Sequence, residues 1–297
     1  MKRDRSINWR RTNAAGLNLK GMRVAIVGGT AGIGRAISRL MASRGATVTV
    51  VGQTFRDADV PGINFIKADL SLMREAKRLG EFLPAETLDM AIFTAGIFAA
   101  PKRQETAEGL ERDMAVSYLS RLVILREIAT RLGIQRPAGQ TKPRVFVMGF
   151  PGVGQTGTLE DLNAEKSYGA MKVHMNTVAG NEMLVLESVK RYPNANFYGL
   201  NPGIIKTDIR SNFMGHNKAL FGLIEGLIGL LTPSAEAYAD KIVPLLVAPD
   251  LEGHSGVHFN KTGDAILPSP GLTDSHVKTF LAASERLIAR IGVSVAH

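Results

Sequence analysis

Short apolar runs that stop at glycines or polar residues recur along this chain, and they predict strands. Each run is nearly continuous and rich in Val, Ile, Ala or Phe, which is typical of strands that a parallel sheet buries on both faces. The runs lie at residues 23–28, 46–51, 63–68, 90–94, 144–148, 195–200 and 256–259.

Apolar residues at helical spacing separate these runs. After the first run, one helical face carries Ile33, Ile37, Leu40 and Met41. Gly45 follows as a helix stop. We expect longer helices over residues 105–132 and 168–191, and a last helix with one apolar face near the end of the chain. That face consists of Val277, Phe280, Leu281, Leu287, Ile288 and Ile291.

Strands that alternate with helices predict right-handed βαβ crossovers and a parallel sheet with helices on both faces. The 297 residues are enough for one large core, and the chain shows no internal repeat and no linker that would divide it. The predicted fold is therefore a single α/β domain with a doubly wound, seven-stranded parallel sheet.

The composition narrows the possible chemistry. Hydrophobic residues make up 45% of the chain and charged residues 21%, which excludes a disordered or collagen-like protein. There is no cysteine, so disulfides, thiolate metal sites and cysteine nucleophiles are excluded. The six histidines are scattered without a metal-ligand spacing, and we expect no metal site.

Most of the net charge of +9 lies in a basic N-terminal arm, which we assign to residues 1–21. Seven Lys and Arg against one Asp give residues 1–23 a charge of +6, which leaves +3 for the other 274 residues. An arm that lies on the body or on a partner subunit fits this pattern, and a mitochondrial transit peptide is the alternative. The mildly basic body has no recognition motif, so we expect no nucleic-acid partner.

The most apolar stretch, residues 219–231, is too short to span a bilayer, which takes about 20 residues, and it contains Glu225. We therefore expect no membrane span. A cytoplasmic location follows as the expectation, with the mitochondrial matrix as the alternative if the arm is a transit peptide.

The strongest chemical signal is the turn after the first strand, Gly28-Gly-Thr-Ala-Gly32-Ile-Gly34, which leads directly into a helix. Glycine permits the sharp turn and lets the backbone approach a pyrophosphate without a Cβ in the way. The N–H groups and the positive dipole end of the helix then favour phosphate charge. A strand, this turn and an amphipathic helix in succession predict a dinucleotide-binding site.

Motifs over nearly the whole chain resemble the short-chain dehydrogenase/reductase family, and most closely its retinol-dehydrogenase-like branch. They are the glycine turn, Asp69 after the third strand, Thr94-Ala95-Gly96 after the fourth, Tyr168-x-x-x-Lys172 after the fifth, and Asn201-Pro202-Gly203 with Thr207 after the sixth. The resemblance implies a Rossmann-type domain over residues 22–297. It also implies a homodimer or homotetramer.

The tyrosine and lysine suggest the chemistry. A neighbouring ammonium favours phenolate, so we expect Lys172 to lower the pKa of Tyr168 from its usual value of about 10. Such a phenol can donate or take a proton while a nicotinamide delivers or accepts hydride. The resemblance further implies that Lys172 holds the nicotinamide ribose.

Departures from the family pattern put catalysis in doubt. The catalytic Ser falls at Gly149 or Phe150, neither of which carries a hydroxyl, and the catalytic Asn falls at Ser117. Loss of one positioned donor typically costs about 10²–10³ in rate. Ser117 holding a relay water, or Thr156 or Thr158 folding in, would compensate.

Three functions therefore stay open. The first is an oxidoreductase that interconverts a carbonyl and an alcohol, with Tyr168, Lys172 and Ser117 as the catalytic residues. The second is a non-catalytic dinucleotide-binding protein, and the third is a C=C reductase of the same fold.

The end of the second strand favours NADP(H) over NAD(H). A carboxylate there would bind the ribose 2′-hydroxyl of NAD, whereas a nearby Arg accommodates a 2′-phosphate. This strand leads into Gln53, with no acid before Asp57, while Arg35 and Arg56 are the nearest cations. The residues expected to hold the cofactor are Gly28, Thr30, Gly32, Ile33, Gly34, Arg35, Gln53, Asp69, Leu70, Ala95, Gly96, Tyr168, Lys172, Pro202, Gly203 and Thr207.

The segment after the sixth strand suggests the substrate. In the family this part closes over the substrate, and here residues 209–231 are apolar with interspersed glycines, which predicts a movable lid and an apolar small-molecule substrate. A dimer contact or an ordinary core helix is the alternative for this segment.

Overall fold

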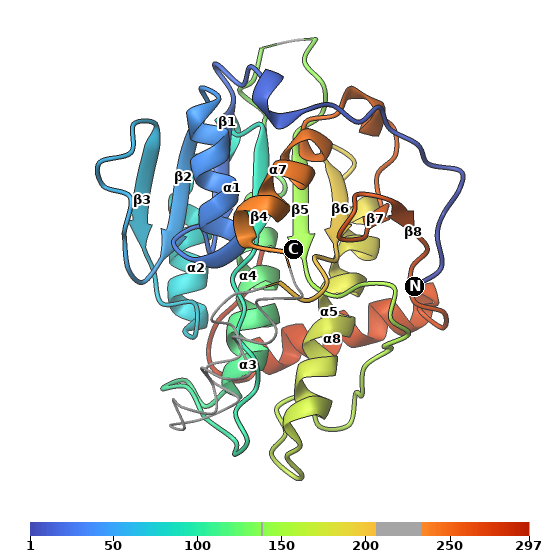
Figure 1. Ribbon diagram of the computed structural model, residues 1–297. Helices are drawn as coiled ribbons and strands as arrows, with labels where there is room; N and C mark the ends of the chain where they lie inside the picture. The colour runs from blue at the N-terminus through green and yellow to red at the C-terminus, as the bar shows by residue number, and fades with distance from the viewer. Residues whose placement is uncertain (138, 206–232, 297) are drawn as a thin grey trace.

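An eight-stranded sheet forms the centre of the protein (Figure 1). The structure, a computed structural model, describes residues 1–137, 139–205 and 233–296. The strand order is β3-β2-β1-β4-β5-β6-β7-β8, and only the β7–β8 pair is antiparallel. The strands are β1 (Arg23–Val27), β2 (Thr47–Gly52), β3 (Ile63–Lys67), β4 (Met90–Phe93), β5 (Arg144–Met148), β6 (Asn196–Leu200), β7 (His258–Phe259) and β8 (Ala265–Ile266).

Helices cover both faces of this sheet. The described helices are α1 (Gly32–Ser43), α2 (Met73–Phe82), α3 (Arg112–Met114), α4 (Ser120–Ile128), α5 (Ala170–Arg191), α7 (Ala235–Leu246) and α8 (Asp274–Arg290), with a π-helical turn η3 (Ala115–Leu119) between α3 and α4. Helices α1 and α7 pack together on one face, where they share a core with Val24 and Ile26. Ala25 and Val27 point to the other face, which α2, α4, α5 and α8 cover.

The predicted fold class is confirmed, with one addition to the sheet. All seven predicted strands are present, but the sheet has an eighth strand, so the expectation of seven strands, all parallel, was wrong. Strand β8 is two residues long and returns antiparallel from β7 through a turn in which Asn260 N donates to Asp264 O (2.9 Å). Two residues are too few for a periodic pattern to reveal.

Two predicted helices begin later than expected. The helix expected at residue 105 begins at Arg112, with Glu111 as its N-cap, and ends at Ile128. The helix expected at Tyr168 begins at Ala170, because Gly169 is extended with φ −145° and ψ 117°. Tyr168 therefore precedes α5, so it does not share a helix face with Lys172.

The N-terminal arm lies on the body of its own chain. In Figure 1 it runs past β8 and then over the sheet to β1. Lys2 O accepts from Leu267 N (2.9 Å) and Asp4 N donates to Ala265 O (2.9 Å), so the arm pairs with β8. Trp9 Nε1 donates to Gly263 O (2.7 Å) just before that strand. In the residues that the structure describes, no helix has both the length and the apolarity to cross a membrane.

Candidate active site

The glycine turn is a backbone cradle at the carboxyl end of β1. Gly28 has φ +95°, a conformation that favours glycine, and a Cβ there would lie 2.3 Å from Ala95 N. A Cβ on Gly34 would lie 2.3 Å from Gly28 O and 2.4 Å from Thr94 Oγ1. The backbone of the turn therefore lies so close to the start of α1 and the end of β4 that a side chain at Gly28 or Gly34 would overlap them.

Helix α1 begins at this cradle with its N–H groups open to a ligand. Its N-cap, Ala31, provides no side-chain hydrogen bond among the residues described, and Ala31 and Gly32 are exposed. Thr30 is buried, with its hydroxyl where a Cβ on Gly52 would be (2.4 Å), and Ile33 is half-buried against the core. An uncapped, exposed helix N-terminus of this kind suits a pyrophosphate.

A cluster of arginines lies beside the cradle, at the end of β2. The carboxylate of Asp57 is buried and accepts from Arg35 Nε (2.8 Å), Arg35 Nη2 (2.7 Å) and Arg39 Nη1 (2.6 Å). The Arg35 guanidinium therefore lowers the pKa of Asp57 from its usual value. Arg56 Nη1 donates to Thr30 O (3.0 Å). Two guanidinium groups, those of Arg35 and Arg39, share the Asp57 carboxylate, and that of Arg56 donates to a carbonyl, so one negative charge faces three positive ones.

Gln53 and Asp69 meet at the ends of β2 and β3. Burial tends to raise the pKa of Asp69, but hydrogen bonds from Ser71 and Gln53 outweigh it and lower the pKa. Gln53 follows β2 at the position where a protein that binds NAD is expected to carry a carboxylate. Leu70, expected at the cofactor, has its side chain in the hydrophobic core.

The end of β4 is fixed by buried polar groups. Thr94 N and Ala95 N both donate to Val27 O (2.8 and 3.0 Å), beside the glycine turn. Beyond the half-buried Gly96, Ile97 N donates to Ser117 Oγ (3.0 Å). Ser117 therefore lies beside the segment that carries Ala95 and Gly96, both expected to hold the cofactor, although its hydroxyl is engaged by protein groups.

The end of β5 carries no hydroxyl where the family has its serine. Gly149 packs on the side chain of Asn181, with an added Cβ 3.3 Å from Asn181 Cβ. The backbone groups of Thr156 and Thr158, expected as substitutes, bond to two helices: Thr156 O contacts His276 Nε2 of α8 (2.6 Å), and Thr158 N donates to Asn176 Oδ1 of α5 (2.8 Å).

The structure contradicts the expected effect of Lys172 on Tyr168. The Tyr168 hydroxyl donates to Ala100 O, and Lys172 is exposed, with no hydrogen-bond or ion-pair partner within residues 1–205 and 233–296. Burial raises the pKa of Tyr168 to about 12, and the charges of Glu111 and Asp113 add to the rise. The pKa of Tyr168 in this structure is therefore raised, whereas the sequence predicted that it is lowered.

The turn after β6 is joined to the turn after β5. Asn201 is fully buried and donates from Nδ2 to Pro151 O (2.9 Å), while its Oδ1 accepts from Gly203 N (3.0 Å). Pro202 is buried and Gly203 has φ +68°. Thr207 and the expected lid over residues 209–231 lie outside the described residues.

A buried polar group that sequence reasoning missed lies behind Ser117. Asp113 is fully buried, accepts from Ser117 Oγ on one oxygen (2.5 Å) and contacts His174 Nδ1 with the other (2.8 Å). Arg121 is also buried and donates to Met148 O, Ala95 O and Asn181 Oδ1. Burial lowers the pKa of Arg121 to about 9. The four-residue spacing of Asp113, Ser117 and Arg121 was the available signal, since it puts them on one helical face.

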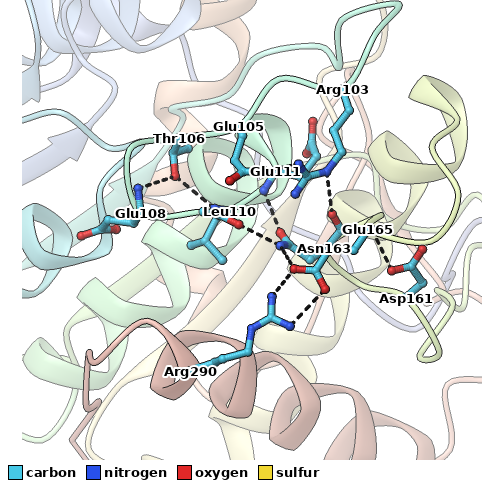
Figure 2. A network of polar contacts seen from close by, with 11 residues as sticks. Arg103, Glu105, Thr106, Glu108, Leu110, Glu111, Asp161, Asn163, Glu165 and Arg290 are labelled. Carbon is cyan, nitrogen blue, oxygen red and sulfur yellow. Dashed lines mark hydrogen bonds and ion pairs between the residues drawn. The ribbon is translucent and has the colours of Figure 1, made fainter.

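A second polar network holds the loops that flank Tyr168, and Figure 2 shows Asn163 at its centre. Asn163 Oδ1 accepts from Glu111 N (2.7 Å), and its Nδ2 donates to Gly109 O and Glu165 Oε1 (both 2.9 Å). Asp161 caps the following turn by accepting from three backbone N–H groups of residues 165–167. Burial raises the pKa of Glu111 to about 7.

We searched the part of the chain that the structure describes for metal ligands. No three of its His, Asp or Glu side chains form a group that could hold a metal ion.

Comparisons with known proteins identify the family of the chain. The sequence profile of the short chain dehydrogenase family matches residues 22–217. An uncharacterized oxidoreductase of Saccharomyces cerevisiae, YKL107W, is 51% identical over 97% of this chain and 95% of its own length. Human retinol dehydrogenase 12 is 27% identical over 84% of this chain and 80% of its own.

Solved structures share the fold. A protein from Mycobacterium paratuberculosis superimposes with a TM-score of 0.69 at 18% identity, covering 97% of this chain and 100% of the other. An NADH-dependent reductase complexed with NAD gives a TM-score of 0.58 at 21% identity, covering 84% of this chain and 98% of the other.

Proposed function

The chain belongs to the short-chain dehydrogenase family, whose members are NAD(P)-dependent oxidoreductases, and on that premise we propose its reaction. We propose that it uses NADP(H) to interconvert a carbonyl and an alcohol on a small, apolar substrate, with Tyr168 as the acid and base. The observation that carries this proposal is the cradle of Gly28 and Gly34 at the uncapped start of α1.

The residues present fit a dinucleotide. The cradle and the α1 N-terminus would hold the pyrophosphate, Ala95 and Gly96 would border the nicotinamide half, and Pro202 and Gly203 would close its other side. Bound NADPH supplies the hydride. The protein supplies position, exclusion of water and the proton.

The arginine cluster supports NADP(H) over NAD(H). Asp57 holds the Arg35 guanidinium with two hydrogen bonds at the end of β2, so this cation is oriented before any ligand arrives. Charge-assisted bonds to a phosphate are the strong kind, and the cluster is positive overall. The NAD found with the structural relative belongs to a protein only 21% identical and does not bear on this preference.

The environment of Tyr168 supports a proton-donating role. A phenol whose pKa is about 12 stays protonated at neutral pH and can give its proton to a developing alkoxide. Reduction of a carbonyl is therefore the direction that this environment favours. Ser117 would act at the same centre, and Lys172 would reach the ribose by closure of the exposed start of α5.

One observation favours the alternative, a dinucleotide-binding protein without turnover. Lys172 is exposed, Tyr168 lies outside α5, and the lysine is not among the described groups that act on the phenol. Neither Gly149 nor Phe150 replaces the missing hydroxyl. The homo-oligomer, the cytoplasmic location and the apolar substrate stay predictions from the resemblance and the sequence.

One experiment separates the two functions. NADPH and NADH are titrated by fluorescence, and NADPH consumption is then followed with aldehydes and ketones of increasing apolar size. We expect NADPH to bind at least about tenfold more tightly than NADH, since one charge-assisted bond is worth about 1.5–3 kcal/mol, and we expect turnover. Binding without turnover would favour the alternative, and failure to bind either dinucleotide would contradict both.

A further inference from the structure

The buried pair Asp113 and His174 has no counterpart among the residues that the proposed reaction uses. Asp113 lies in α3 and His174 in α5, 61 positions apart, and their side chains meet at 2.8 Å between Oδ2 and Nδ1. Asp113 is fully buried, and the His174 side chain is 16% exposed. Burying a carboxylate costs free energy unless other groups bond to it, and Ser117 and His174 supply those bonds here.

This pair holds one loop, residues 97–100, from several sides. Ser117, bonded to Asp113, accepts from Ile97 N (3.0 Å). The His174 ring stacks on Phe98 with centroids 3.8 Å apart and 23° between the planes. The same loop ends in Ala100, whose carbonyl accepts the hydrogen bond of the Tyr168 hydroxyl.

We propose that Asp113 and His174 are a positioning pair for Tyr168. By ordering residues 97–100 they fix the carbonyl that orients the Tyr168 hydroxyl, and the negative charge of Asp113 acts on that hydroxyl. This inference rests on the proposed function of Tyr168 as proton donor. It assigns to His174 no contact with the substrate.

Electrostatics agree with this geometry. The charged groups acting on Tyr168 are Glu111 and Asp113, which raise its pKa, and Arg103, which lowers it. The positive charge of Arg121 faces Asp113 from α4. Lys172 is absent from the groups that act on Tyr168 among the described residues, so burial first, and then the charges of Glu111 and Asp113, raise the pKa of Tyr168.

The variant Asp113→Asn separates charge from shape. An asparagine still bridges Ser117 and His174, because the imidazole can present Nδ1 as an acceptor in its other tautomer. The pKa of Tyr168 is measured in the ligand-free protein from tyrosinate absorbance, as the difference between each protein and its Tyr168→Phe counterpart. We expect Asp113→Asn to lower this pKa from about 12 toward 10. An unchanged titration would overturn the electrostatic part of the proposal.

The variants His174→Ala and His174→Asn test the positioning part. Alanine removes both the bond to Asp113 and the stacking on Phe98, and we expect kcat for reduction to fall about tenfold or more while the dissociation constant of NADPH is unchanged. Asparagine restores the donor to Asp113, and we expect it to recover much of kcat. The matched control is His276→Ala, which removes an imidazole that contacts the Thr156 carbonyl.

The outcomes distinguish this inference from the proposed function. If the wild type turns over and His174→Ala keeps kcat within twofold of it, the positioning role of the pair is contradicted. The same follows if His174→Asn does not recover kcat. Neither outcome contradicts the proposed function. A wild-type protein without turnover contradicts the proposed function, and the Tyr168 titration in Asp113→Asn then still decides whether the pair controls the phenol.

Discussion

The carboxyl ends of β1 and β2 and those of β4 and β5 lie along one edge of the sheet, yet they are built by different means. The first region is made of backbone: Gly28, Gly34 and the open N–H groups of α1, with an arginine cluster at its border. The second is made of buried side chains, with Asp113, Ser117 and Arg121 holding the turns after β4 and β5.

A site built from backbone is easier to infer from local sequence than a site built from side chains. A backbone cradle needs only glycine at two or three positions, so its ligand can be inferred from local sequence. A side-chain site depends on partners brought together by the fold, so the loss of one hydroxyl at Gly149 leaves open what replaces it. The following changes test this contrast, from the largest expected effect to the smallest.

Gly28→Ala changes the turn in the region that is made of backbone. The added Cβ would lie 2.3 Å from Ala95 N on a residue with φ +95°, so the turn must move. We expect NADPH binding, measured by fluorescence, to weaken about 100-fold or more, because the displaced turn loses several hydrogen bonds to the pyrophosphate. Gly16→Ala is the matched control, since a Cβ there meets nothing within 4 Å and φ is not positive. Equal binding by both variants would show that the turn holds no phosphate.

Arg35→Ala attacks the border of the same region. Arg39 still pairs with Asp57, so the buried carboxylate keeps one partner. We expect the affinity for NADPH to fall about tenfold while that for NADH is unchanged, because only NADPH carries the 2′-phosphate. Arg39→Ala is the control, and we expect a smaller effect from it. Parallel losses for both dinucleotides would contradict a 2′-phosphate site at Arg35.

The sequence predicted the first region well and the second only in part. Seven strands, the glycine turn and its helix follow from local pattern, because a buried parallel strand and a βα turn need few residues to specify them. The late start of α5 depends on the extended Gly169, and the Asp113–His174 contact joins residues 61 positions apart. Neither leaves a periodic signal. The pKa of Tyr168 was predicted in the wrong direction, because burial and two nearby carboxylates raise it and Lys172 is exposed.

The buried Glu111 should make the free energy of unfolding depend on pH, and we expect this effect to be the smallest of the three. Burial raises its pKa from 4.5 to about 7, so between these values the folded protein keeps a proton that the unfolded chain has released. The free energy of unfolding should therefore fall as the pH rises from about 4.5 to 7 and level off above. We expect this fall, on the order of 1–3 kcal/mol, to be absent in Glu111→Gln when both proteins are unfolded by urea across the pH range. Identical pH dependence in the two proteins would contradict the burial effect.

Tyr168→Phe tests the proposal that this protein reduces a carbonyl with a proton from Tyr168. NADPH binding is measured first, followed by NADPH consumption with the best carbonyl found for the wild type. We expect turnover to fall about 10²–10⁴-fold at an unchanged dissociation constant, because the phenol gives the proton but does not hold the dinucleotide by its hydroxyl. Turnover within a few fold of the wild type would contradict the account.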